Sequence, residues 1–247
     1  MLYSILYYLF LVIFLIIYSV FISLVWLFTV LFDKKRSVIA VTTYYHALSV
    51  FLFSPRWKVK IEGIENIDRS KNYVVVSNHQ GFLDIPLIHM LKLHVRWVAK
   101  KELIKMPFVG HAMLIHGDIL LDRKDPQSAK TMMKKALKIL GQGVSVAIFP
   151  EGTRSKTGRM GRFKDGAFLV AKRAGADILP LVIDGTKNVV NGWKLIVPHA
   201  FTIKVLPVIP KEKVRDTDVK TLTSEVHDII LREHQLMRPD LYEDKND

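Results

Sequence analysis

A histidine and an aspartate, His79 and Asp84, lie five positions apart just after a short apolar run. The run, residues 73–76, contains three consecutive β-branched valines and predicts a buried strand. Asp84, with Pro86 two positions later, is typical of the first turn of a helix. The pair is therefore expected on a strand-to-helix loop. In open α/β sheets such loops, at the carboxyl ends of the strands, carry the groups that bind ligands.

The spacing of these two residues fits acid–base chemistry only if the loop folds back. On a continuous helix their side chains would point about 140° apart, given roughly 3.6 residues per turn. A turn containing Gly81 can instead bring the carboxylate onto the imidazole. His79 would then be a general base held in one tautomer by Asp84, and the hydroxyl of a bound substrate would replace the serine of a hydrolase triad. Taken alone, the spacing also fits a structural histidine and a helix-capping aspartate.

A second polar segment, residues 149–155, directly follows the apolar strand expected at 144–148. Gly152 lets the backbone approach a ligand closely. Arg154 offers a planar guanidinium suited to a phosphate group. The neighbouring side chains can donate to, or accept from, a hydroxyl: Glu151, Thr153 and Ser155. This set predicts binding of a phosphorylated polyol.

These segments resemble the glycerolipid acyltransferase family, and most of all the 1-acyl-glycerol-3-phosphate acyltransferases. The resemblance rests on Asn78-His79 with Asp84 and on Phe149-Pro150-Glu151-Gly152-Thr153-Arg154-Ser155, about seventy residues later. Two weaker blocks also match, residues 117–123 and the apolar residues 178–182 around a proline. The similarity covers residues 57 to about 210. All four blocks in this order are hard to explain by chance.

The resemblance implies a reaction and its participants. His79 would take the proton from the sn-2 hydroxyl of lysophosphatidic acid while Asp84 orients the ring, and the alkoxide would attack an acyl thioester to give phosphatidic acid. The donor would be acyl-coenzyme A or acyl carrier protein. No metal, organic cofactor or covalent acyl-enzyme is implied, in line with the absence of cysteine. Residues expected to bind the substrate are Glu151, Gly152, Thr153, Arg154, Arg123, Lys105 and Arg159.

Two other functions stay open from the sequence. The chain could be an acyltransferase that uses glycerol-3-phosphate or another lysophospholipid as acceptor. It could also be a non-catalytic membrane protein that binds lipid. Intact His79 and Asp84 favour an enzyme.

The charge balance indicates an acidic partner. Lysine and arginine exceed aspartate and glutamate by a formal net charge of +13. No nucleic-acid-binding motif accompanies this charge, so an anionic membrane lipid surface is the expected partner rather than nucleic acid. Four lysines on one side of the helix expected at 126–140 are typical of a solvated face, and their alternative use is docking of an acidic carrier protein.

The N-terminal segment differs from the rest of the chain. Residues 1–32 contain no charged side chain and exceed the roughly 20 apolar residues that cross a bilayer core. Charged residues 33–36 end this run and indicate a cytoplasmic flank. Residues 37–54 predict a second helix, expected to lie in the membrane interface, with an ordinary core helix of the soluble domain as the alternative. We expect a membrane module at 1–56, in which the first helix spans or both helices enter one leaflet, and an acyltransferase domain at 57–247 on the cytoplasmic face of an inner or plasma membrane.

From residue 57 the pattern alternates between strands and helices. This alternation predicts an α/β fold with a mixed, largely parallel sheet flanked by helices, and the resemblance implies the glycerol-3-phosphate acyltransferase type. Strands are expected at 58–62, 73–77, 96–99, 119–121, 144–149, 178–183 and 201–206, and helices at 85–93, 102–105, 126–140, 164–174 and 219–236. Pro107 and Gly110 predict a break, and residues 237–247 a disordered tail. The histidines other than His79 and His46 show no carboxylate at a useful loop spacing and are assigned no role.

Overall fold

The computed structural model describes residues 2–54, 56–187, 189–191 and 193–243. Its centre is a seven-stranded sheet in the order β1-β9-β6-β2-β5-β3-β4. The strands are β1 (Trp57–Glu62), β2 (Tyr73–Ser77), β3 (Val95–Lys100), β4 (Ile119–Leu121), β5 (Ser145–Ile148), β6 (Asp177–Asp184) and β9 (His199–Val205). Neighbouring strands pair in parallel, except that β6 and β9 are antiparallel. The predicted mixed, largely parallel sheet is confirmed.

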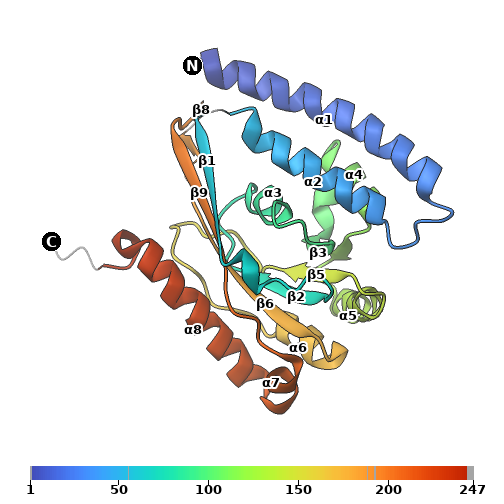
Figure 1. Ribbon diagram of the computed structural model, residues 1–247, viewed down its shortest axis with the longest axis vertical. Coiled ribbons are helices and arrows are strands. Elements are labelled where there is room, and N and C mark those ends of the chain that lie inside the picture. Colours follow the sequence, from blue (N-terminus) through green and yellow to red (C-terminus); the bar gives the residue numbers. More distant parts are fainter. Residues whose placement is uncertain (1, 55, 188, 192, 244–247) are drawn as a thin grey trace.

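Helices cover both faces of this sheet (Figure 1). Val75 of β2 packs in the apolar cluster that also contains buried residues of α1, α2 and α3, whereas Val74 and Val76 pack in the cluster formed with α5, α6, α7 and α8. Side chains of a strand alternate between its two faces, so the valine run of β2 is buried on both. The helices are α1 (Leu2–Thr29), α2 (Ser37–Leu52), α3 (Asp84–His89), α4 (Val109–His116), α5 (Pro126–Gly141), α6 (Gly166–Ala174), α7 (Lys211–Asp216) and α8 (Val219–Met237).

The N-terminal helices α1 and α2 lie side by side along one side of the molecule, with α8 on the opposite side of the sheet (Figure 1). Tyr7, Val50 and Phe51 from these helices share one apolar cluster with Trp57 and Phe201 of the sheet. Helix α1 also exposes a long series of large apolar side chains on its outer surface. It is long and apolar enough, by length and composition, to cross a membrane.

Polar contacts fasten α1 and α2 to the remainder of the protein near both ends of α1. The N–H of Leu195 donates to Ser4 Oγ at 3.0 Å. Near the other end, Ser23 Oγ lies 2.7 Å from Nε2 of His111 on α4. In the turn between the two helices, the Arg36 guanidinium donates to backbone carbonyls of α4. Helix α1 therefore follows the surface of the sheet domain rather than projecting from it.

The connection before α4 differs from the prediction. A short 3₁₀ helix, η2 (Lys101–Lys105), is followed by a turn at Phe108, which has φ 61°, and α4 begins at the next residue. Gly110 lies inside this helix rather than breaking it. A Cβ atom at Gly110 would be 2.0 Å from the Ile104 carbonyl oxygen, so glycine is required there by close packing.

Other boundaries also moved. The helix expected at 85–93 ends at His89, because the chain turns through a left-handed conformation at Lys92, with φ 57°. Helix α7 and the short hairpin of β7 (Val190–Asn191) and β8 (Lys194–Leu195) were not expected. The expectation of disorder is wrong for 237–243, which includes the 3₁₀ helix η3 (Pro239–Leu241). Residues 244–247 of that predicted tail lie outside the described residues.

Candidate active site

The two polar segments found in the sequence leave the sheet side by side. Strands β2 and β5 are parallel neighbours, with Val76 opposite Ile148, so their carboxyl ends lie at the same edge. Just beyond them, the N–H of Ser155 donates to the His79 carbonyl at 2.8 Å. The Asn78 side chain forms two hydrogen bonds of 2.8 Å to the backbone of Ile183, which fixes the start of the first loop against β6.

His79 and Asp84 are in contact, as the turn containing Gly81 predicts. His79 Nδ1 lies 2.6 Å from Asp84 Oδ2. The same oxygen accepts the N–H groups of Gln80 at 2.7 Å and Gly81 at 3.0 Å, and Thr186 Oγ1 donates to Oδ1. The Asp84 side chain is fully buried. Because the carboxylate oxygen is an acceptor, Nδ1 of His79 must carry the proton in the neutral ring, which leaves Nε2 as the basic nitrogen.

The imidazole is held flat against an aromatic surface. Its ring stacks on Phe149 with centroids 4.0 Å apart and planes 10° apart, and Phe149 stacks in turn on Trp97 at 5.5 Å. The His79 side chain keeps 17% of its surface exposed. Within the described part of the chain, no recorded hydrogen bond uses His79 Nε2. The geometry leaves this nitrogen available to a ligand.

Glu151 braces the two segments against each other. Its Oε1 accepts the N–H of His79 at 2.7 Å, and its Oε2 accepts the N–H of Gly161 at 2.8 Å. Burial raises the pKa of this carboxyl to about 7, against the opposing effect of the two backbone hydrogen bonds. The sequence suggested that Glu151 accepts a substrate hydroxyl. In the structure each of its oxygens accepts one backbone N–H group.

The basic residues selected from the sequence are distributed along the same edge of the sheet. Arg154 and Thr153 are exposed on the turn after β5. Gly152 in this turn has φ +73°, and Lys164 Nζ lies 3.3 Å from where its Cβ would be. Arg154 lies between two residues that contact the His79 loop, Ser155 directly after it and Glu151 three residues before it.

Lys105 and Arg123 belong to neighbouring strand ends and are also exposed. Lys105 is in η2 after β3, and Arg123 follows β4, the third strand along from β2 in the sheet. With strands about 4.8 Å apart, β4 is about 14 Å from β2. The structure therefore gathers these residues at one edge but not in contact with His79.

Arg159 is directed toward the C-terminal segment. Its Nε donates to the Leu241 carbonyl, and its guanidinium lies 6.0 Å from the centre of the Tyr242 ring. The Tyr242 hydroxyl accepts the N–H of Met160 at 2.8 Å and lies 2.8 Å from Nδ1 of His234. The segment expected to be disordered thus holds the loop that carries Arg159.

Some histidines that were assigned no role do have carboxylate partners. His116 Nδ1 lies 2.6 Å from Asp118, only two positions away, and the same carboxylate accepts the N–H of Trp97. His234 is completely buried, 2.9 Å from the amide nitrogen of Gln80 and 3.8 Å from Asp184. Sequence spacing could not reveal the second contact, because His234 and Gln80 are 154 positions apart.

The chain is similar in sequence to known acyltransferases. Residues 58–184 match the family model described as Acyltransferase. A chloroplastic 1-acyl-sn-glycerol-3-phosphate acyltransferase of Arabidopsis thaliana is 38% identical over 176 residues, which are 70% of this chain and 49% of the relative. A 1-acyl-sn-glycerol-3-phosphate acyltransferase of Borreliella burgdorferi is 32% identical over 188 residues, 73% of either chain. The chain spans about half the length of the plant relatives it matches.

The fold also matches a solved structure. The crystal structure of the 1-acyl-sn-glycerophosphate acyltransferase of Thermotoga maritima superposes with a TM-score of 0.66 and 27% sequence identity. The match covers 91% of this chain and 95% of that one.

Proposed function

The chain belongs to the acyltransferase family, and from this membership we propose that it transfers an acyl chain from a thioester to the sn-2 hydroxyl of 1-acyl-glycerol-3-phosphate, giving phosphatidic acid. The observation that carries the proposal is the contact between His79 and the buried carboxylate of Asp84. In this contact Nδ1 of His79 faces Asp84, and Nε2 is left for a ligand at the carboxyl ends of the strands, where ligands bind in α/β folds. The names of the relatives support this choice of acceptor.

The site can perform the transfer in one displacement. Nε2 of His79 takes the proton of the acceptor hydroxyl while its oxygen attacks the thioester carbonyl, so that a C–O bond forms and the C–S bond breaks. The departing thiolate then takes the proton from the imidazolium. Asp84 stabilises the imidazolium, and the stack on Phe149 fixes the plane of the ring. The reaction needs no nucleophile from the protein.

Arg154 is the proposed partner of the acceptor phosphate. It is exposed and directly precedes Ser155, whose N–H is bonded to the His79 carbonyl, so the backbone of Arg154 lies next to the His79 loop. Guanidinium groups bind phosphate through two parallel hydrogen bonds. Arg123, Lys105 and Arg159 remain further candidates for substrate binding along the same edge, and Glu151, Gly152 and Thr153 remain candidates on the turn that carries Arg154.

We place α1 and α2 in one leaflet of an inner or plasma membrane, with the sheet domain on the cytoplasmic face. The contacts of Ser4 and Ser23 with the sheet domain support this arrangement, because a helix crossing the bilayer would carry those partners into the hydrocarbon core. The exposed apolar side chains of α1 would lie among lipid chains, and the excess positive charge would favour an anionic lipid surface.

The donor is an acyl thioester carried by coenzyme A or by acyl carrier protein. Both carriers present the same phosphopantetheine thioester, so the displacement at His79 is the same for either. A rival function is acylation of glycerol-3-phosphate or another lysophospholipid, and a non-catalytic lipid-binding protein is a third. The contact of His79 with Asp84 favours an enzyme over the third.

The test is an acyl-transfer assay on the purified full chain in detergent. We expect phosphatidic acid from lysophosphatidic acid with acyl-coenzyme A or acyl carrier protein, and His79→Ala should abolish this activity without unfolding the domain. His227→Ala is the matched control, since among the described residues the side chain of His227 is hydrogen-bonded only to its neighbour Asp228, 2.9 Å away, and packs edge-on against Phe163. Activity with glycerol-3-phosphate alone would overturn the choice of acceptor, and transfer surviving in His79→Ala would overturn the base.

A further inference from the structure

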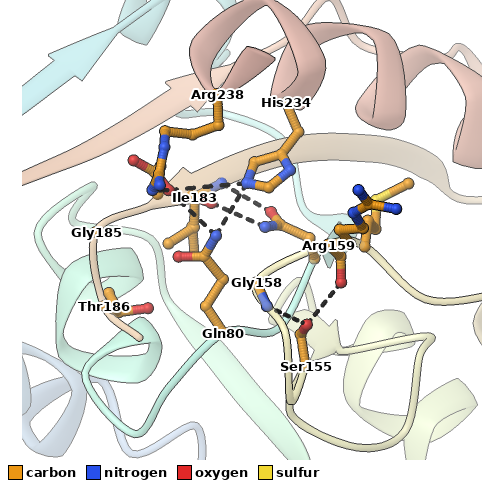
Figure 2. Close-up of polar contacts among 12 residues, drawn as sticks. Gln80, Ser155, Gly158, Arg159, Ile183, Gly185, Thr186, His234 and Arg238 are labelled. Carbon is orange, nitrogen blue, oxygen red and sulfur yellow. Dashed lines mark hydrogen bonds and ion pairs between the residues drawn. The ribbon is translucent and has the colours of Figure 1, made fainter. Parts of the chain in front are cut away.

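A polar pocket lies at the same edge of the sheet as the His79 loop, next to β6 and β9. Its volume is about 240 Å³, and its walls include Gln80, Gly185, Lys187, His199, Arg238 and Leu241. Gln80 is the residue after His79, so the pocket adjoins the loop that holds the base. Figure 2 shows Gln80, Gly185 and Arg238 around this space, with His234 above Gln80.

Gln80 lines this pocket and has a side-chain hydrogen-bond acceptor without a partner among the described residues. Its side chain is 5% exposed, and its Nε2 lies 3.2 Å from Asp184 Oδ1 and 2.9 Å from Nε2 of His234. The carboxylate oxygen of Asp184 can only accept, so the amide nitrogen must face it and the orientation of the amide is fixed. Oε1 is then buried and, among the described residues, has no hydrogen-bond partner. In Figure 2 this oxygen is turned away from His234.

Lys187 contributes positive charge that other side chains do not balance. Its Nζ donates to the Lys156 carbonyl at 2.5 Å, and within the described chain no carboxylate forms an ion pair with it. Arg238 differs, because it pairs with Asp184 at 3.1 Å and with Asp240 at 2.8 Å. The pocket therefore combines a buried acceptor with one available cation.

These two features specify the chemistry of the ligand. Gln80 Oε1 requires a hydrogen-bond donor, which a fully ionised phosphate cannot supply, whereas Lys187 favours an anion. Phosphopantetheine carries both, since its chain contains two amide N–H groups and a hydroxyl and ends in a phosphate. We propose that this pocket binds the phosphopantetheine arm of the acyl donor and aims its thioester toward His79. The inference rests on the proposed function for the identity of the donor, and it applies equally to coenzyme A and acyl carrier protein.

The test measures binding apart from turnover. Isothermal titration calorimetry of coenzyme A against the full chain in detergent is compared for the wild type, Lys187→Glu and the matched control Lys220→Glu, an exposed lysine on α8. We expect Lys187→Glu to weaken coenzyme A binding and to raise the KM for acyl-coenzyme A at least tenfold, with the KM for lysophosphatidic acid unchanged. The control should behave as the wild type.

Competition identifies the part of the donor that is bound. Free 4′-phosphopantetheine should displace coenzyme A, whereas adenosine 3′,5′-bisphosphate should not. The proposal is overturned if phosphopantetheine does not bind the wild type, or if Lys187→Glu raises only the KM for lysophosphatidic acid. Failure of the proposed function would give a different result. Phosphopantetheine would still bind at Lys187, but no acyl transfer would be detected with any acceptor.

Discussion

Replacing Glu151 by glutamine distinguishes a structural brace from a substrate ligand. The carboxylate accepts one backbone N–H on each oxygen, from His79 at 2.7 Å and from Gly161 at 2.8 Å. Glutamine has the same shape but only one acceptor oxygen. Its NH₂ group must therefore face one of the two N–H donors, and that donor loses its partner inside the protein.

The size of the effect follows from this loss. A buried donor left without a partner costs about 1–3 kcal/mol. If this free energy destabilises the conformation in which His79 is positioned for proton transfer, kcat decreases by about 5- to 150-fold. The conversion uses about 1.4 kcal/mol for each tenfold change in rate. The KM for the acceptor should stay near the wild-type value if the role of Glu151 is to hold the backbone of the two loops.

The assay compares kcat and KM of the wild type, Glu151→Gln and the control Glu212→Gln, an exposed residue of α7. It is run at pH 8, above the pKa of about 7 that burial gives Glu151, so that the wild-type carboxyl is ionised and accepts both bonds. An unchanged kcat with a raised KM for lysophosphatidic acid would refute the bracing role and restore the role of hydroxyl acceptor suggested by the sequence.

The raised pKa of Glu151 also predicts how stability depends on pH. The pKa rises from 4.5 to about 7 on folding because burial disfavours the charged form. The contribution of Glu151 to the free energy of unfolding is therefore fully present below pH 4.5, and it is lost as the pH rises through 7. Chemical denaturation should show that decline between pH 4.5 and 7 in the wild type, and Glu151→Gln should lack this component of the decline.

Three further substitutions test the loop and the site. Asp84→Asn keeps an oxygen for the loop N–H groups but removes the charge that stabilises the His79 imidazolium, so kcat should fall on the order of 10³- to 10⁴-fold with the melting temperature nearly unchanged; a fall below tenfold would contradict the role of the charge. Arg154→Gln should raise the KM for lysophosphatidic acid by about 10- to 150-fold, for a charged hydrogen bond of about 1.5–3 kcal/mol, and an unchanged KM would exclude phosphate binding there. Gly81→Ala places a Cβ 2.5 Å from the Thr186 carbonyl and should lower the free energy of unfolding by about 1–3 kcal/mol, measured by denaturation; equal stability would mean that this approach is not close in solution.

The sequence predicts best what is local. The valines of β2 predicted a buried strand, and Gly81 allowed a loop that folds back and brings Asp84 onto His79, because both features depend on neighbours in the chain. The spacing alone fitted a structural histidine and a capping aspartate as well. The largely parallel sheet followed from the alternation of elements. Gly110 was misread since glycine can serve a turn or a close helix contact, and only the position of Ile104 separates the two.

Long-range partners were not predictable in the same way. Thr186 donates to Asp84 across 102 positions, and no spacing rule points to it. The hydrogen bonds from His79 and Gly161 to Glu151 were not predictable either, because they depend on how two loops pack together. Such packing is decided by the tertiary fold, to which hydrogen bonds between distant segments contribute.

The outer surface of α1 has a consequence for the membrane itself. A helix of 28 residues is about 42 Å long at 1.5 Å per residue, and most of its exposed side chains are large and apolar. If the helix lies along one leaflet, it would increase the area of that leaflet and leave the area of the opposite leaflet unchanged. Loosely packed or convex bilayers offer room for such a wedge, so vesicles of small radius should recruit this protein more strongly than flat ones of the same lipids.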